Sequence, residues 1–204
     1  MKGKGRHEHK LYINMSDYMQ ISSKLIMEEA QRLASLVNDI LDVSKLERGA
    51  MELNATTYNF TESIEQLVDR VAKLVDKGGY SFTFEYEESV FVKADEVKIT
   101  QAFYNLLVNA IHYSKTDLHI IIRQITSDTS VKIEVEDHGD GIKEDIPYIW
   151  DKYYKGGEKH KRAITGTGLG LYIVKKIIEL HGGSYGVESK LNIGSFFWFQ
   201  IEKI

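Results

Sequence analysis

The chain has 204 residues, which is enough for one good-sized domain or for a domain with an appendage. Hydrophobic residues make up 43% of it, enough for a packed core, and a formal net charge of -4 gives no general attraction to nucleic acid or to an anionic membrane. The lack of cysteine excludes disulfides, thiolate metal sites and a cysteine nucleophile.

The first predicted element is one long helix over residues 12–48. Its apolar and small residues step by four and three, which is the spacing of a heptad seam. These positions are Ile26, Ala30, Leu33, Val37, Ile40 and Ser44. Gly49 is a stop signal. So much apolar surface on one helix needs partner helices, and the alternative is a helix packed on the surface of its own domain.

The rest of the chain alternates between strand and helix patterns, which predicts a mixed α/β domain and an α+β fold class. Residues 54–60 predict a short strand or an entry loop, and Thr61 or Ser63 begins a helix that ends at Gly78–Gly79. Asp95 predicts the N-cap of a helix that runs to about Ser114. The other expected helices cover 146–154, with Pro147 in the first turn, and 169–180, and 155–167 is a polar loop. The other expected strands cover 80–86, 90–92, 118–125, 131–136, 184–189 and 195–201.

Two asparagines mark the helix before Ser114. Asn105 and Asn109 are four residues apart, so both amides lie on one helical face, with apolar residues on the other side. Asparagine is a poor helix former, and its amide oxygen is a hard ligand suited to a hydrated magnesium ion or to phosphate-linked water. The alternative is a pair of ordinary buried amides bonded to the backbone.

A carboxylate and two glycines follow the strand over 131–136. Asp137 at the strand end can accept a hydrogen bond from an exocyclic amine such as that of adenine, and Gly139 and Gly141 let the backbone approach a flat ring. The further acidic ligands of an EF-hand are missing, and the alternative is a plain Asx turn.

A basic loop and three alternate glycines precede the last predicted helix. Aromatic residues at 148–154 lead into the loop, which has the character of a mobile, phosphate-attracting lid or of a solvated surface loop. The glycines are Gly166, Gly168 and Gly170. No Gly-Lys-Ser/Thr follows, as a Walker loop requires, and the G-x-G-x-G spacing differs from the Rossmann fingerprint.

In this order, the motifs resemble the Bergerat ATP-binding fold, and within it the catalytic domain of sensor histidine kinases. Residues 105–110 are similar to the N box, 137–142 to the G1 box, 150–155 to the F box and 166–171 to the G2 box. Residues 32–47 resemble the second helix of the dimerisation and phosphotransfer hairpin. The resemblance therefore implies residues 1–50 as part of that hairpin region and 51–204 as the catalytic domain. The implied catalytic fold is a two-layer α/β sandwich, a mixed sheet with helices on one face.

The resemblance also implies ATP and Mg²⁺ as cofactors. It places Mg²⁺ at Asn109, with Asn105 as a second candidate, the adenine amine at Asp137, and an aromatic contact to the nucleotide at Tyr113. The residues that it implies for ATP binding are Asn105, Asn109, His112, Tyr113, Asp137, Gly139, Gly141, Ile142, Tyr154, Lys155, Gly166, Thr167, Gly168, Leu169, Gly170 and Leu171.

Four positions depart from the family pattern. His112 stands where lysine is common, so positive charge there depends on pH, and His138 replaces a common asparagine. Tyr153 and Lys155 replace phenylalanine and arginine, and lysine lacks the arginine fork. We expect nucleotide binding to survive these changes.

The acceptor motif, close to His-Glu-Leu-Arg-Thr-Pro, is missing, because the only proline is Pro147. His7 and His9 lack the continuation of that motif, and His119, His160 and His181 read as ordinary surface or loop residues. The chain thus resembles a fragment of a longer kinase that donates phosphate to a histidine elsewhere. None of its 204 residues acts as the catalytic acceptor.

The implied partners are ATP or ADP, an acceptor hairpin, a response regulator and a second copy through the N-terminal helix, with no nucleic acid. No apolar run approaches the roughly 20 residues of a membrane span and no signal peptide is evident, so we expect a cytoplasmic chain whose parent kinase can be membrane-anchored. The alternatives are an anti-sigma-type serine kinase, a nucleotide-binding regulatory module without turnover, and a structural helix-dimer protein.

Overall fold

The computed structural model describes residues 15–49, 52–115, 117–142, 146–154 and 167–204. Its long helices are α1 (Met15–Glu47), α2 (Phe60–Val75), α3 (Glu96–Tyr113) and α4 (Gly170–Leu180), and short 3-10 turns cover Asp76–Gly78 and Ile146–Tyr148. Its strands are β1 (Thr56–Asn59), β2 (Ser81–Glu85), β3 (Phe91–Ala94), β4 (His119–Thr126), β5 (Ser130–Asp137), β6 (Ser184–Lys190) and β7 (Gly194–Glu202).

The chain forms two compact units, residues 1–38 and 39–204. The first contains most of α1, whose described apolar residues Leu33 and Val37 are exposed. The helix ends as predicted at Gly49, which has φ +62 and donates its N–H to Leu46 O at 3.2 Å. The second unit begins inside α1, because Val43 is buried to 6% exposure in the main hydrophobic core.

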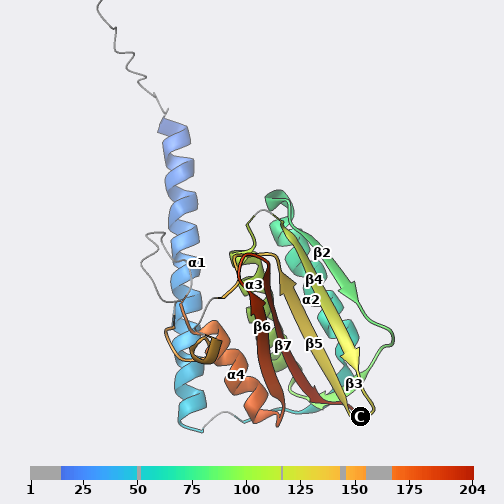
Figure 1. Ribbon diagram of the computed structural model, residues 1–204. Coiled ribbons are helices and arrows are strands. Elements are labelled where there is room, and N and C mark those ends of the chain that lie inside the picture. Colours follow the sequence, from blue (N-terminus) through green and yellow to red (C-terminus); the bar gives the residue numbers. More distant parts are fainter. Residues whose placement is uncertain (1–14, 50–51, 116, 143–145, 155–166) are drawn as a thin grey trace, which may run out of the picture. The chain divides into compact units, whose positions relative to one another are not determined.

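A five-stranded sheet in the order β2-β4-β5-β7-β6 organises the second unit (Figure 1). Only the β2–β4 pair is parallel, so the sheet is mixed, as predicted. Alternate residues of the central strands are buried, since a strand turns successive side chains to opposite faces. Ile133 on β5 and Phe199 on β7 form one such buried cross-strand pair, each 0% exposed.

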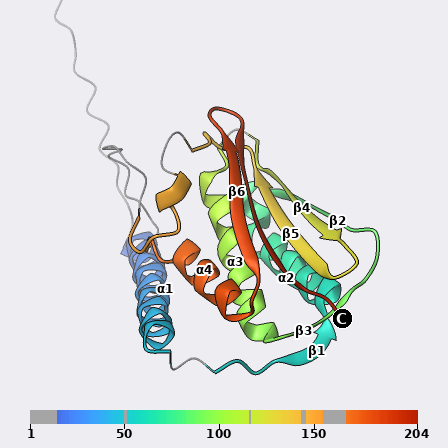
Figure 2. The same cartoon turned by 60° about the horizontal axis from the view of Figure 1, so that its bottom comes forward.

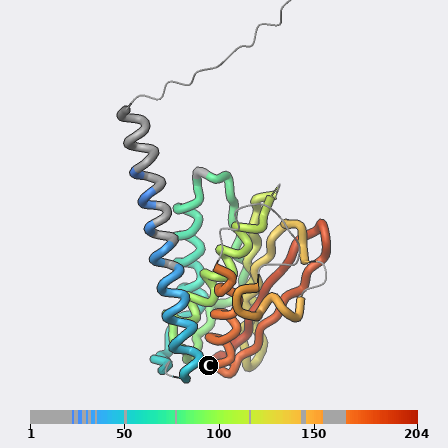
Figure 3. The backbone as a smooth tube through the Cα atoms, turned by 90° about the vertical axis from the view of Figure 1, so that its left-hand side faces the viewer, coloured from blue at the N-terminus to red at the C-terminus, as the bar shows by residue number. Residues whose placement is uncertain are grey.

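Helices α2, α3 and α4 cover one face of this sheet, and β1 and β3 form a separate antiparallel pair (Figures 1 and 2). Viewed from the side, the helices and the strands form two layers (Figure 3). The inward face of α3 is apolar, and Phe103, Leu106 and Leu107 are each 0% exposed. At about 25 cal/mol per Å² of buried apolar surface, this face is a main source of the domain's stability.

Capping residues fix where two helices begin. The Asp95 carboxylate accepts the Lys98 N–H at 3.1 Å, as predicted for α3. The cap of α2 is Asn59, which accepts the Glu62 N–H at 3.2 Å, so this helix begins at Phe60, ahead of the predicted Thr61 or Ser63.

The predicted helix over 146–154 is wrong. Only Ile146–Tyr148 forms a 3-10 turn, and Tyr153 adopts a positive φ of 60, which a continuing α-helix does not allow. The Tyr153 N–H instead donates to Gly168 O at 2.9 Å, so the segment folds toward the glycine-rich turn.

His181 is more than an ordinary surface or loop residue, contrary to the prediction. Its Nδ1 lies 2.8 Å from Ile177 O and its Nε2 accepts the Asp95 N–H at 3.1 Å. Because a carbonyl oxygen only accepts, the ring carries its proton on Nδ1. The Asp95 carboxylate also accepts the Asn54 N–H at 2.9 Å. One imidazole thus joins the end of α4 to the start of α3.

We predict that His181→Ala lowers the free energy of unfolding by about 1–2 kcal/mol, because it leaves a partly buried N–H and a helix end without partners. Urea unfolding of both proteins measures this. Glu65→Ala, an exposed change on α2, is the control and should stay within about 0.5 kcal/mol of the parent. Equal stability of His181→Ala and the control would contradict a linking role for His181.

Candidate nucleotide site

The two asparagines of α3 have different surroundings. Asn105 is half-buried, and its Nδ2 donates to Gly170 O, the first residue of α4, at 3.4 Å. Asn109 lies one turn further, also half-buried, and its amide has no hydrogen-bond partner in the part of the chain that the structure describes. The Asn105 oxygen and the whole Asn109 amide are therefore available to a ligand.

Asp137 ends β5 and is 3% exposed. Its Oδ1 accepts the Gly139 N–H at 2.8 Å, and the Ser195 N–H also donates to the carboxylate. Burial raises the pKa of Asp137 above its ordinary value, and these hydrogen bonds oppose that shift. A carboxylate placed where water solvates it poorly favours a bound donor such as an amine.

The turn after Asp137 requires glycine at two positions. A Cβ on Gly139 would lie 2.5 Å from Tyr113 O, at the end of α3, and the residue forms an isolated β-bridge with Ser114. Gly141 has φ +70, and a Cβ there would lie 2.3 Å from Lys190 O. The turn is thereby fixed between α3 and the β6–β7 hairpin.

The glycine-rich turn before α4 is held by its own backbone and by one hydroxyl. Thr167 Oγ1 accepts the Leu169 N–H at 3.1 Å and donates to Asp39 Oδ2 at 3.1 Å. Gly168 has φ +71, and a Cβ there would lie 3.0 Å from Tyr153 Cα, so a larger residue would strain this junction. Helix α4 begins at Gly170 with no side-chain cap.

Helix α3 connects these parts. Asn105 meets the start of α4, and Tyr113 meets the turn that follows Asp137. These two contacts are eight residues apart on α3, or ~12 Å at 1.5 Å per residue. Three groups therefore lie along one side of α3. The buried Asp137 carboxylate is near one end, the start of α4 is near the other, and the amides of Asn105 and Asn109 lie along the helix. This suits an elongated ligand with an amine at one end and negative charge at the other.

The structure brings most of the predicted site residues into this region. Tyr113 is exposed and stacks edge-on with His112 at a centroid distance of 5.0 Å. Ile142 donates its N–H to Ser189 Oγ at 2.8 Å. Tyr154 and Leu171 are half-buried against the core. Lys155 and Gly166 lie outside the described residues.

Three supporting residues were missed by the sequence reasoning. Ser189 and Ser195 join their hydroxyls at 2.8 Å beside the glycine turn, and no sequence pattern marks them. Asp39 bonds Thr167 across 128 positions of the chain. No sequence pattern distinguishes Asp39 from the other acidic residues of the predicted long helix.

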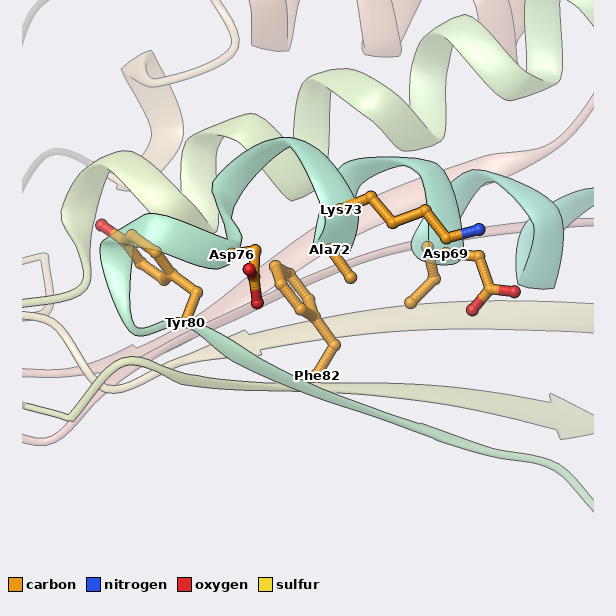
Figure 4. A pocket seen from close by; sticks show the side chains of 7 residues that line it. Asp69, Ala72, Lys73, Asp76, Tyr80 and Phe82 are labelled. Carbon is orange, nitrogen blue, oxygen red and sulfur yellow. The ribbon is translucent and has the colours of Figure 1, made fainter.

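One hollow on the described surface lies away from these residues. It measures about 380 Å³, lies between α2 and β2, and contains none of the predicted site residues (Figure 4). Phe82 and Ala72 line it, while the Tyr80 hydroxyl donates to Ile111 O at 3.0 Å. A smaller hollow of about 250 Å³ does include Asp137, Ser189 and Ser195.

The described residues include no group of three or more His, Asp or Glu side chains that could hold a metal. Within the same ranges, no helix is long and apolar enough to cross a membrane.

Residues 94–203 match the family model described as histidine kinase-, DNA gyrase B-, and HSP90-like ATPase. The chain belongs to this family. The sensor protein SrrB of Staphylococcus aureus is 30% identical over 188 residues, which are 92% of this chain and 32% of that protein. The chain thus spans about a third of the length of the curated relatives it matches.

Solved structures agree with the fold. The catalytic domain of the histidine kinase ThkA is 33% identical to this chain. The match covers 75% of this chain and 97% of the ThkA chain, with a TM-score of 0.64. ThkA in complex with the response regulator protein TrrA is 27% identical, with a TM-score of 0.72 over 94% of this chain and 53% of that one. Full-length ShkA in complex with AMPPNP is 22% identical and shares the fold, with a TM-score of 0.76 over 95% of this chain and 40% of that one. The resemblance to sensor histidine kinases and the two-layer fold are confirmed.

We predict that Asp137→Asn stabilises the fold at neutral pH. A raised folded-state pKa means that the stabilising contribution is fully present below the unfolded pKa and is lost as pH rises through the folded pKa. In urea unfolding, the excess stability of Asp137→Asn over the parent should therefore grow as pH rises from about 4, the ordinary pKa of an aspartate, through the higher folded-state pKa. If the free energy of unfolding of the parent instead rises relative to that of Asp137→Asn as pH rises, the charged carboxylate itself stabilises the fold.

Proposed function

We propose that this chain is the catalytic part of a two-component sensor histidine kinase, which binds Mg-ATP and donates the γ-phosphate to a histidine outside these 204 residues. The observation that carries the proposal is the convergence on α3 of the buried Asp137 carboxylate, the Asn109 amide and the start of α4. Family membership and the kinship with sensor kinases support it.

Each part of the site has a role in the proposal. The Asp137 carboxylate accepts a hydrogen bond from the adenine amine, and the Gly139 turn leaves room for the ring. The backbone N–H groups at the start of α4 face the phosphate charge. The nucleotide would make its remaining contacts with the other ATP-binding residues that the family resemblance implies, including Lys155 and Gly166.

The amides of α3 fit a magnesium ion. Asn109 would hold it through its amide oxygen and Asn105 through the oxygen that its bond to Gly170 leaves unused. The ion would neutralise charge on the phosphate oxygens. The two amide oxygens lie on one face of α3 and have no partner among the described residues, which supports this assignment.

The assembly around the site is also a proposal. Residues 1–50 belong to the dimerisation and phosphotransfer region, and 51–204 form the catalytic domain. The acceptor is a histidine hairpin, the next recipient is an aspartate of a response regulator, and the intact kinase is a homodimer through the N-terminal helix. The solved complex of ThkA with a response regulator protein supports a response regulator as one of these partners.

Mixing the chain with ATP, magnesium and a separate acceptor hairpin tests the function. We expect acid-labile phosphate on the hairpin and none on the chain alone. Asn109→Ala should lower the transfer rate at least about tenfold, because a metal ligand is lost, whereas the exposed Asn54→Ala should leave it unchanged.

Other outcomes would replace the proposal. Acid-labile labelling of the chain by itself would contradict an external acceptor. Label on serine of an added substrate would indicate the anti-sigma type of kinase. Nucleotide binding without transfer to any acceptor would indicate a regulatory module, and no binding would leave a structural helix protein.

A further inference from the structure

The last turns of α1 carry three carboxylates that reach three parts of the candidate site. Asp39 bonds Thr167 in the glycine-rich turn. Asp42 accepts the Gln101 amide of α3 at 2.7 Å, and Glu47 pairs with Lys152 in the aromatic segment. All three belong to the compact unit that starts at Asp39. We refer to Asp39, Asp42 and Glu47 as the acidic clasp.

Asp39 holds the most consequential position of the three. The Thr167 hydroxyl donates to the Asp39 carboxylate while it accepts the Leu169 N–H, both at 3.1 Å. The carboxylate therefore lies one hydroxyl away from the first backbone donors of α4. A helix start carries partial positive charge and stabilises a nearby anion. Asp39 already supplies such an anion.

The nucleotide would bring a second anion to the same place. Under the proposed function, the start of α4 faces the phosphates, and α4 has no side-chain cap of its own. Partial burial strengthens the repulsion between two negative charges, since solvent screens them less. Water is partly removed from the Asp39 carboxylate, and this burial raises its pKa. Asp39 is half-buried.

We propose that the acidic clasp, through Asp39, competes with the phosphates of a nucleotide for the start of α4. The proposal rests on the proposed function, because it needs a phosphate-bearing ligand at that site. Its consequence is a reciprocal coupling: engaged clasp residues weaken phosphate binding, and bound phosphates loosen the end of α1. Val43, buried next to the clasp, would transmit that loosening to the core.

The competition predicts an effect that scales with phosphate number. Asp39→Asn keeps an oxygen that can accept the Thr167 hydroxyl and removes only the charge. We expect it to tighten binding of a non-hydrolysable ATP analogue about threefold to tenfold, that of ADP by less, and that of adenosine not at all. Calorimetric titration of the parent and variant with the three ligands, with magnesium, measures this.

Controls separate the clasp from general charge. Asp69→Asn removes an exposed acid on α2, away from the site, and should change none of the three affinities. The gain of Asp39→Asn should shrink at high salt, since screening weakens charge repulsion. A thermal melt of each variant checks the fold.

Two results would overturn the clasp alone. One is that the parent and Asp39→Asn bind each of the three ligands with the same affinity. The other is a parallel change for all three ligands, adenosine included, which is the mark of a purely structural role. If the parent binds neither ADP nor the ATP analogue, the proposed function and the clasp both fail.

Discussion

The fixed position of α3 is the constraint on which the site depends. Its inward side chains are fully buried, so the helix cannot turn or slide without opening the core. Its outer face then sets the separation between the two ends of the candidate site. Asn105 holds the start of α4, and Tyr113 presses against the glycine turn after Asp137. The two ends of the site are therefore spaced by a rigid helix rather than by loops.

Several residues of the candidate site are poor choices for stability, and the proposed ligand would explain them. A carboxylate at 3% exposure is poorly solvated, and its two backbone hydrogen bonds only partly offset that loss. Asparagine at two positions of α3 is a poor helix former. The positive φ at Gly141 and Gly168 favours glycine, which has no side chain to add packing. The sequence departs from the best choice for stability at the positions that line one side of α3.

The sequence predicted the core of the fold well because periodicity is local. Alternating residues in β5 and β7 and the Asp95 cap of α3 need only near neighbours to be recognised. The candidate site was predicted from the order of four motifs, each weak alone, and its residues stay a prediction. What failed depends on distant contacts. The segment 146–154 is drawn out of a helix by the bond from Tyr153 to Gly168, and His181 acquires its role from Asp95, 86 positions away.

The same limit applies to the link between α1 and the site. Asp39 lies on the predicted long helix, and nothing near it in the sequence points to Thr167. Only the folded chain shows that the final turns of α1 pack within the second compact unit, residues 39–204. The two functions proposed for the chain, nucleotide binding and helix association, would thus meet in one segment.

The central claim is that the side of α3 between Asp137 and the start of α4 binds a magnesium nucleotide. Titration with a fluorescent ATP analogue tests it most directly. The account predicts saturable, magnesium-dependent binding that excess ADP displaces and that Asp137→Asn weakens by about tenfold or more, since a hydrogen bond to a charged group is lost. Binding that ignores magnesium, resists ADP and survives in Asp137→Asn would contradict it.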